Sequence, residues 1–371
     1  MIQNLLLVLF AAVAVAQTPS RVPLAPSAAS QNFVRALQQL PKAMQPMQNL
    51  FDAVVYQGAI QPETKLAMGL RIAQIYGSAY LTSQMERRLN ATPHGKAFLA
   101  KAPTDAESTL ALSYAEKLTK DIHGVTDADF RQVRTQYNDN QVVELTITTC
   151  FFNYLVRFAE AFRLPVEGDS VISARSQTEA PTARVGLISD AEMAAVEAMQ
   201  RRNRERPSAL GIGFANSMRA MLRSPAAASA WLTYGAAVSE YAAIDRTLKL
   251  HISFAVSTAN GCRYCTLHQV QGLRRQGVSI AKLVAMKKDD SALTPRELTA
   301  VQFTRKLTAA PSTITDADYG KLKAEFGEQG AMEVVLQTCA FAYMNRFTDG
   351  LRLPSEDEAV QTYKEVYGKT W

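Results

Sequence analysis

Apolar residues recur at three- and four-residue spacing through most of the chain, the periodicity of helices with one buried face. The clearest stretches are residues 141–162 and 331–351, and Arg-Leu-Pro closes each, where proline ends a helix. Another start is predicted at Thr294-Pro295, with Thr294 as the cap and Pro295 in the first helical position. Alternating patterns typical of strands are scarce. The pattern therefore predicts an all-α fold.

The second half of the chain repeats the first at a shift of 189 residues. Thr126-Asp127-Ala128-Asp129-Phe130 returns as Thr315-Asp316-Ala317-Asp318-Tyr319. The same shift relates Glu144 to Glu333, Cys150 to Cys339, Tyr154 to Tyr343, Arg157 to Arg346, and Arg163-Leu164-Pro165 to Arg352-Leu353-Pro354. We predict two tandem domains, residues 33–168 and 190–371, joined by a linker at 169–189 and packed as a pseudo-dimer.

The N-terminus has the pattern of a secretory signal. An apolar run in residues 5–15 ends in Ala14-Val15-Ala16, a small-x-small cleavage site. The run is short for a membrane span, so we do not expect a membrane-spanning protein. Residues 1–16 are predicted to be a signal peptide and 17–32 a flexible lead. The expected location is the periplasm or an extracellular space.

Composition narrows the class of protein. A chain of 371 residues with 47% hydrophobic and 20% charged residues suits two globular domains. The net charge of +6 is spread along the sequence rather than clustered. We therefore expect no nucleic-acid partner.

The candidate chemistry lies in Asn260-Gly261-Cys262-Arg263-Tyr264-Cys265-Thr266-Leu267-His268, which holds the only Cys-x-x-Cys of the chain. A cysteine at a helix start can be held partly as thiolate, and a nearby imidazole can exchange protons near neutral pH. The pair therefore indicates a thiol redox centre. A structural disulfide and a metal site remain alternatives, although zinc would need further ligands that the sequence does not supply.

The remaining candidates have structural interpretations. Cys150 and Cys339 occupy equivalent places in apolar helices and are expected to be buried thiols, with a disulfide between the halves as the alternative. Glu144 and Glu333 occur in both halves and are expected to pair with Arg157 or Arg346 or to cap helices. His94 and His123 are expected to lie on the surface.

The string Asn-Gly-Cys-x-Tyr-Cys, after a helix that begins at Ile244-Asp245-Arg246, resembles the AhpD-like alkylhydroperoxidase / carboxymuconolactone decarboxylase superfamily. The resemblance covers most of residues 235–355 and, through the repeat, most of 50–168. It implies an all-helical, usually oligomeric domain that reduces hydroperoxides. By this resemblance Cys265 is the attacking thiol, Cys262 the resolving thiol and His268 the proton-relay histidine.

The sequence departs from the family pattern in two places. The family histidine usually stands where this chain has Gln269, one residue after His268, and the family glutamate usually stands at the position of Leu250. We expect the neighbouring His251 to substitute for that glutamate, with Glu240 or Asp245 as alternatives.

In the N-terminal half the positions of both thiols and of the histidine hold other residues. The alignment places Ser78, Leu81 and Gln84 opposite Cys262, Cys265 and His268. This half is therefore predicted to be a degenerate copy that supplies a packing surface.

These observations predict an exported thiol peroxidase that takes a hydroperoxide substrate and an external dithiol electron donor. No bound cofactor or metal is expected, and a homo-oligomer is possible. Two alternatives stay open: a non-catalytic helical scaffold with vestigial thiols, and a lactone-decarboxylating enzyme of the same superfamily, which would not need two thiols.

Overall fold

The computed structural model describes residues 20–24, 31–100, 105–167, 216–369 and 371. The predicted signal peptide, most of the predicted lead, the linker and residues 190–215 lie outside the described residues. Within them the fold is all-α, as the sequence predicts, and no strand is present.

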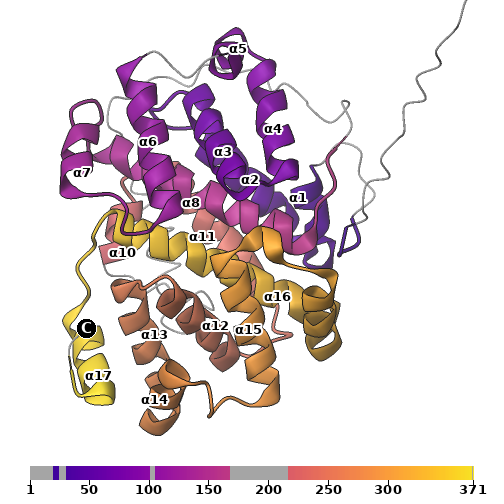
Figure 1. Ribbon diagram of the computed structural model, residues 1–371, viewed down its shortest axis with the longest axis vertical. Helices are drawn as coiled ribbons and strands as arrows, with labels where there is room; N and C mark the ends of the chain where they lie inside the picture. The colour runs from indigo at the N-terminus through magenta and orange to yellow at the C-terminus, as the bar shows by residue number, and fades with distance from the viewer. Residues whose placement is uncertain (1–19, 25–30, 101–104, 168–215, 370) are drawn as a thin grey trace, which may run out of the picture.

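The N-terminal half contributes one group of helices and the C-terminal half a second group (Figure 1). The first group is α1 (Asn32–Arg35), η1 (Ala36–Gln39), α2 (Pro41–Tyr56), α3 (Pro62–Tyr76), α4 (Ala79–Asn90), α5 (Pro93–Ala100), α6 (Ala106–Lys120), α7 (Asp127–Val133) and α8 (Asp139–Phe162). The second is α10 (Asn216–Met221), α11 (Pro225–Ser239), α12 (Arg246–Ala259), α13 (Arg263–Arg275), α14 (Ile280–Lys288), α15 (Pro295–Ala309), η3 (Pro311–Thr313), α16 (Asp316–Gly350) and α17 (Asp357–Tyr367).

Helix boundaries follow the capping chemistry that the sequence indicates. Thr126, Thr294 and Thr315 each cap a helix in a reciprocal capping box with the acid three residues later. The C-terminal half joins the counterparts of α7 and α8 into α16, which kinks at Gly327, where φ is +70°. A positive φ suits glycine because it has no Cβ.

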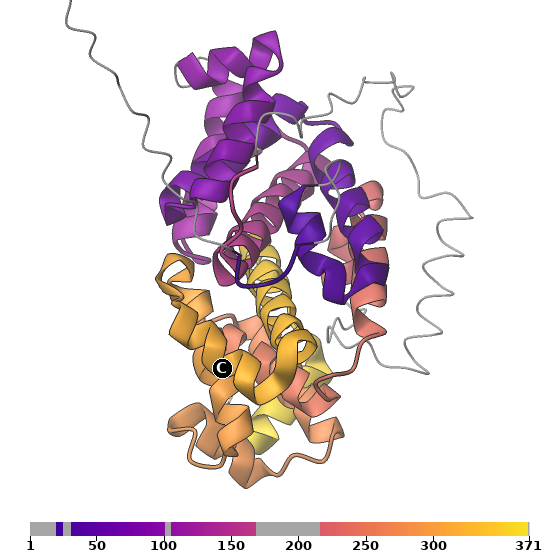
Figure 2. The same ribbon diagram turned by 90° about the vertical axis from the view of Figure 1, so that its right-hand side faces the viewer.

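Two helix pairs join the halves, which stack one above the other in Figure 2. The long helices α8 and α16 pack against each other, and α2 packs against α11. By length and composition α8 could cross a membrane, but its apolar window is buried inside the protein.

Reciprocal hydrogen bonds show the pseudo-twofold relation between the halves. Arg157 on α8 donates to the backbone oxygen of Thr308 at 2.9 Å, and Arg346 on α16 donates to that of Thr119 at 3.3 Å. Both guanidinium groups also donate to the hydroxyl of Tyr76, at 3.1 and 3.2 Å. Buried cations are costly unless hydrogen bonds replace their water, so these contacts hold the halves in one register.

Glu144 and Glu333 occupy equivalent places in the repeat and have structural roles, but arginine is not their partner. Glu144 pairs with buried Lys65, and Glu333 pairs with buried Lys249 at 3.0 Å. Each glutamate also accepts backbone N–H groups from the residues just before the next helix, such as Ala59 at 2.9 Å and Ala243 at 2.9 Å. Arg157 and Arg346 turn instead toward the opposite half.

Cys150 and Cys339 are free and fully buried, as expected, and no disulfide joins them. Burial raises the pKa of both thiols, so they remain protonated and behave as small apolar groups.

Candidate thiol site

The cysteine pair sits at the junction of α12 and α13. Helix α12 ends shortly before Gly261, whose φ is +71°, and Cys262 then caps α13. Its sulfur accepts the backbone N–H of Cys265 at 3.3 Å. The N-terminal end of a helix carries partial positive charge, which acts against the rise in the pKa of Cys262 that burial causes.

The structure brings both sulfurs together around one hydroxyl. Thr348 Oγ1 lies 3.4 Å from the sulfur of Cys262 and 3.4 Å from that of Cys265. Both cysteines are free thiols. Cys262 is fully buried, and Cys265 is 4% exposed. The pair is thus sheltered, with Cys265 the only one of the two that solvent reaches.

A carboxyl group that the sequence interpretation missed lies beside Cys262. Asp349, next to Thr348 on α16, interacts with the Cys262 thiol. Burial raises the pKa of Asp349 to about 6, while Cys262 and His123 act in the opposite direction. Burial also raises the pKa of the Cys262 thiol well above its ordinary value. The repeat carries a signal for this residue, because an acid, Glu160, stands 189 positions earlier.

The position of the family glutamate belongs to the core. Leu250 is 3% exposed and faces Gly272 on α13, where an added Cβ would lie 3.1 Å from its side chain. A carboxylate there would have to be desolvated between two helices.

His251 is not brought to the sulfurs. Its ring is fully buried, with Nδ1 3.1 Å from Glu297 Oε1 on α15. Burial lowers its pKa, and Glu297 acts against that shift. The other two acids considered for the missing glutamate are also engaged elsewhere: Glu240 pairs with Lys42 at the surface, and Asp245 caps α12.

His268 lies one helical turn after Cys265 and contacts Glu356 through Nε2. Its ring packs on Tyr264, with centroids 4.3 Å apart. Glu356 also accepts from the Tyr264 hydroxyl at 3.1 Å and from the backbone N–H of Asn216 at 2.7 Å. Burial lowers the pKa of His268. Its Nδ1 is buried and has no hydrogen-bond partner among the described residues.

The N-terminal half contains the same frame without the thiols. Ser78 occupies the N-cap position of α4 without a side-chain cap hydrogen bond, and Glu160 lies beside its hydroxyl. Glu167 accepts from the Tyr80 hydroxyl at 2.8 Å, as Glu356 does from Tyr264. The hydrogen bond between a glutamate and a tyrosine is therefore common to both halves. Only the C-terminal half adds a histidine, His268, that contacts the glutamate.

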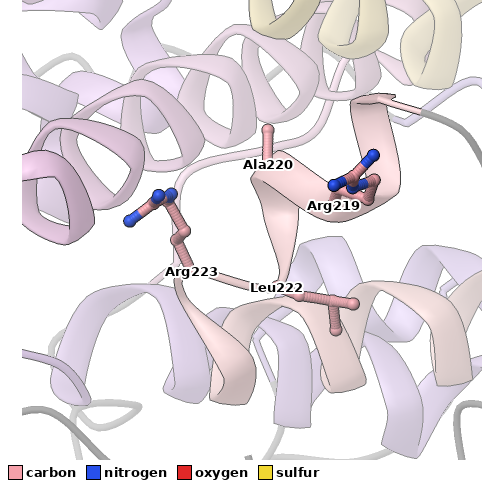
Figure 3. Close-up of a pocket in the computed structure, with 4 residues that line it drawn as sticks. All are labelled: Arg219, Ala220, Leu222 and Arg223. Carbon is pink, nitrogen blue, oxygen red and sulfur yellow. The ribbon is translucent and has the colours of Figure 1, made fainter. Parts of the chain in front are cut away.

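Other features offer little for cofactor binding. Among the described residues no group of three or more His, Cys, Asp and Glu side chains could hold a metal ion. An open hollow of about 410 Å³ is lined by Arg219, Ala220, Leu222 and Arg223 (Figure 3). Arg223 donates to Asn140 Oδ1 at 3.3 Å, and neither cysteine lines this hollow.

Comparison with known proteins agrees with the resemblance seen in the sequence. Residues 225–306, which include both Cys262 and Cys265, match the Carboxymuconolactone decarboxylase family. No curated protein matches. A similar solved structure is a cysteine-to-alanine variant of the debrominase Bmp8 in complex with 2,3,4-tribromopyrrole. It is 20% identical with a TM-score of 0.42, covering 51% of this chain and 100% of that chain.

Proposed function

We propose that the protein is an exported thiol-dependent peroxidase that reduces hydroperoxides with the Cys262–Cys265 pair. The observation that carries this proposal is the meeting of two free thiols at the Thr348 hydroxyl with the Asp349 carboxyl beside Cys262. The family match supports an enzyme of this superfamily, because the matched segment contains both cysteines.

The first step is attack by the Cys265 thiolate on the terminal oxygen of a hydroperoxide. The S–O bond forms as the O–O bond breaks, the alkoxide leaves and takes a proton to become an alcohol, and Cys265 becomes a sulfenic acid. Cys265 has this role because it is the less buried of the two cysteines and lies in the first turn of α13.

The second step closes the disulfide. Cys262 gives its proton to the Asp349 carboxylate and attacks the sulfenic sulfur, while the sulfenic oxygen leaves with a proton from solvent as water. Since Cys262 is buried and its pKa is raised, it needs a base within reach, and Asp349 is the described group in that position. An external dithiol then reduces the disulfide and is itself oxidised.

His268 is proposed as an accessory proton relay. His268 lies on α13, the helix that Cys262 caps and that contains Cys265, and its contact with Glu356 holds the imidazole ring in place. The proposed export rests on the pattern of residues 1–16 and places the dithiol donor outside the cytoplasm.

Burial favours a second candidate, a helical scaffold with vestigial thiols. With Cys262 fully buried and Cys265 only 4% exposed, a hydroperoxide must displace surrounding side chains to react. The two functions make opposite predictions for the reaction of the reduced protein.

Stopped-flow measurement of hydroperoxide loss by the reduced protein separates them. A peroxidase consumes one equivalent and forms one disulfide, Cys265→Ser abolishes this reaction, and Cys262→Ser leaves a sulfenic acid that a dimedone probe captures. His268→Gln tests the relay, and Cys339→Ser, which alters a buried thiol away from the pair, serves as the control. Equal, background rates in all variants would establish the scaffold instead.

A further inference from the structure

A loop of the N-terminal half covers the thiol site of the C-terminal half. This loop, residues 121–126 between α6 and α7, carries His123, whose Nε2 would lie 3.4 Å from a methyl group added at Gly261. Arg352 beyond the end of α16 donates to the backbone oxygen of Val125 at 3.4 Å and pairs with Asp127. These contacts hold the loop against the segment that bears Cys262.

Three groups near the Gly261 turn differ in their exposure to solvent. His123 is exposed, Asp349 is half-buried, and Cys262 is fully buried. The charge of His123 favours the ionised form of Asp349, and the Cys262 thiol interacts with the same carboxyl group. The backbone N–H of His123 donates to Asp121 Oδ1 at 2.9 Å, which orders the loop.

The equivalent place over the degenerate half has no such histidine. Gly77 corresponds to Gly261 and has a similar φ of +67°, yet a methyl group added there would meet nothing within 4 Å. Ser312 stands 189 positions after His123. The carboxyl group Glu160 instead experiences the charge of Arg21, which cannot exchange protons near neutral pH. A histidine from the opposite half therefore lies near the thiol-bearing turn, and in the part of the chain that the structure describes none lies at the equivalent place near Gly77.

We propose that His123, supplied by the thiol-free half, is a positioning residue that exchanges protons between Asp349 and solvent. This inference rests on the proposed function. When Cys262 has given its proton to Asp349, the imidazole removes that proton to solvent and so restores the carboxylate. The degenerate half accordingly completes the site of the other half.

The test is the steady-state rate of hydroperoxide consumption with excess dithiol donor, because each new cycle requires Asp349 to be deprotonated again; it is followed from pH 5.5 to 9 in wild type and His123→Gln. We expect a loss of roughly tenfold near pH 7 and its recovery on addition of free imidazole, because a small base can replace a proton-exchanging side chain. His94→Gln is the matched control, since His94 is an exposed histidine on α5 of the same half. Identical pH profiles for the two variants, without imidazole rescue, would overturn the inference.

A second readout does not depend on turnover. The pKa of Asp349, followed by carboxyl ¹³C NMR and assigned with Asp349→Asn, should rise in His123→Gln because a nearby positive charge is lost. No change would overturn the inference even in an active enzyme. A wild-type protein that consumes no hydroperoxide but shows this rise would refute the peroxidase proposal and retain the electrostatic link between the halves.

Discussion

The thiol-bearing junction at Cys262 and its counterpart at Ser78 share a backbone and differ in chemistry. In both, a glycine with positive φ precedes the N-cap residue of the helix, and an acid on the long helix lies beside the side chain of that residue. A serine hydroxyl does not take up two-electron redox chemistry, so the acid at Glu160 has no thiol to deprotonate. The difference teaches that the frame is a property of the fold, whereas the chemistry depends on a few side chains placed in it.

The largest expected effect tests whether the buried lysine–glutamate pairs of the two halves contribute equally to stability. Lys249→Met leaves the buried Glu333 carboxylate without its cation, and Lys65→Met does the same to Glu144. Each change should reduce the free energy of unfolding by about 3–5 kcal/mol, the usual cost of leaving a buried charge unpaired. Urea denaturation monitored by circular dichroism measures it. A large loss for one variant and none for the other would show that the halves are not equivalent scaffolds.

The next largest effect is on the rate of disulfide formation, which should depend on the acid beside Cys262 and not on the acid beside Ser78. Asp349→Asn should slow disulfide formation by about 100-fold at pH 7.5, because general-base catalysis is lost. In the wild type this rate should rise with pH through about 6, where Asp349 ionises, and the variant should lack that rise. Glu160→Gln is the matched control and should leave the rate unchanged. A slow Glu160→Gln protein would mean that the degenerate half is catalytic after all.

Asp349→Asn should also stabilise the protein at high pH. Asp349 has an ordinary pKa of 3.8 and a folded-state pKa of about 6, so the folded protein binds this proton more tightly. Stability from this group is therefore present below pH 4 and is lost as pH rises to 6. The difference between a pKa of 3.8 and one of about 6 corresponds to roughly 3 kcal/mol at most. Thermal unfolding should show Asp349→Asn above wild type at pH 8 and equal to it at pH 4; an equal melting temperature at pH 8 contradicts the assignment.

The smallest effect concerns the exposed ion pairs between the halves. Arg352 pairs with Asp127, and Arg163 pairs with Asp316 at 2.6 Å. Either arginine replaced by alanine should cost about 1 kcal/mol or less, since water and salt screen exposed pairs. Denaturation at low and high salt checks this, and a larger loss for Arg352→Ala would show that the loop with His123 depends on this contact.

Much of the fold follows from local sequence signals. The cap at Thr294 is set by neighbouring residues, so the sequence alone predicts it correctly. An arginine partner for Glu144, one of the roles that the sequence suggests, is wrong. Lys65 reaches it from another helix, a tertiary contact without a sequence signature.

The site was predictable only in part for the same reason. Cys262 and Cys265 are close in sequence, and the structure brings them together. Asp349 is remote in sequence, whereas the substitutes that the sequence suggests lie near Leu250, where α12 packs on α13 through apolar side chains. His123 was correctly placed on the surface, but only the docking of the halves brings it to the site.

The crossed bonds of Arg157 and Arg346 have a consequence for how the chain can be divided. If the halves were produced as separate polypeptides, each guanidinium would lose a carbonyl acceptor that only the other polypeptide provides. Each fragment would also present the apolar flank of α8 or α16 to water. Such fragments should be insoluble alone and recover structure only when mixed, because each half needs contacts that the other half provides.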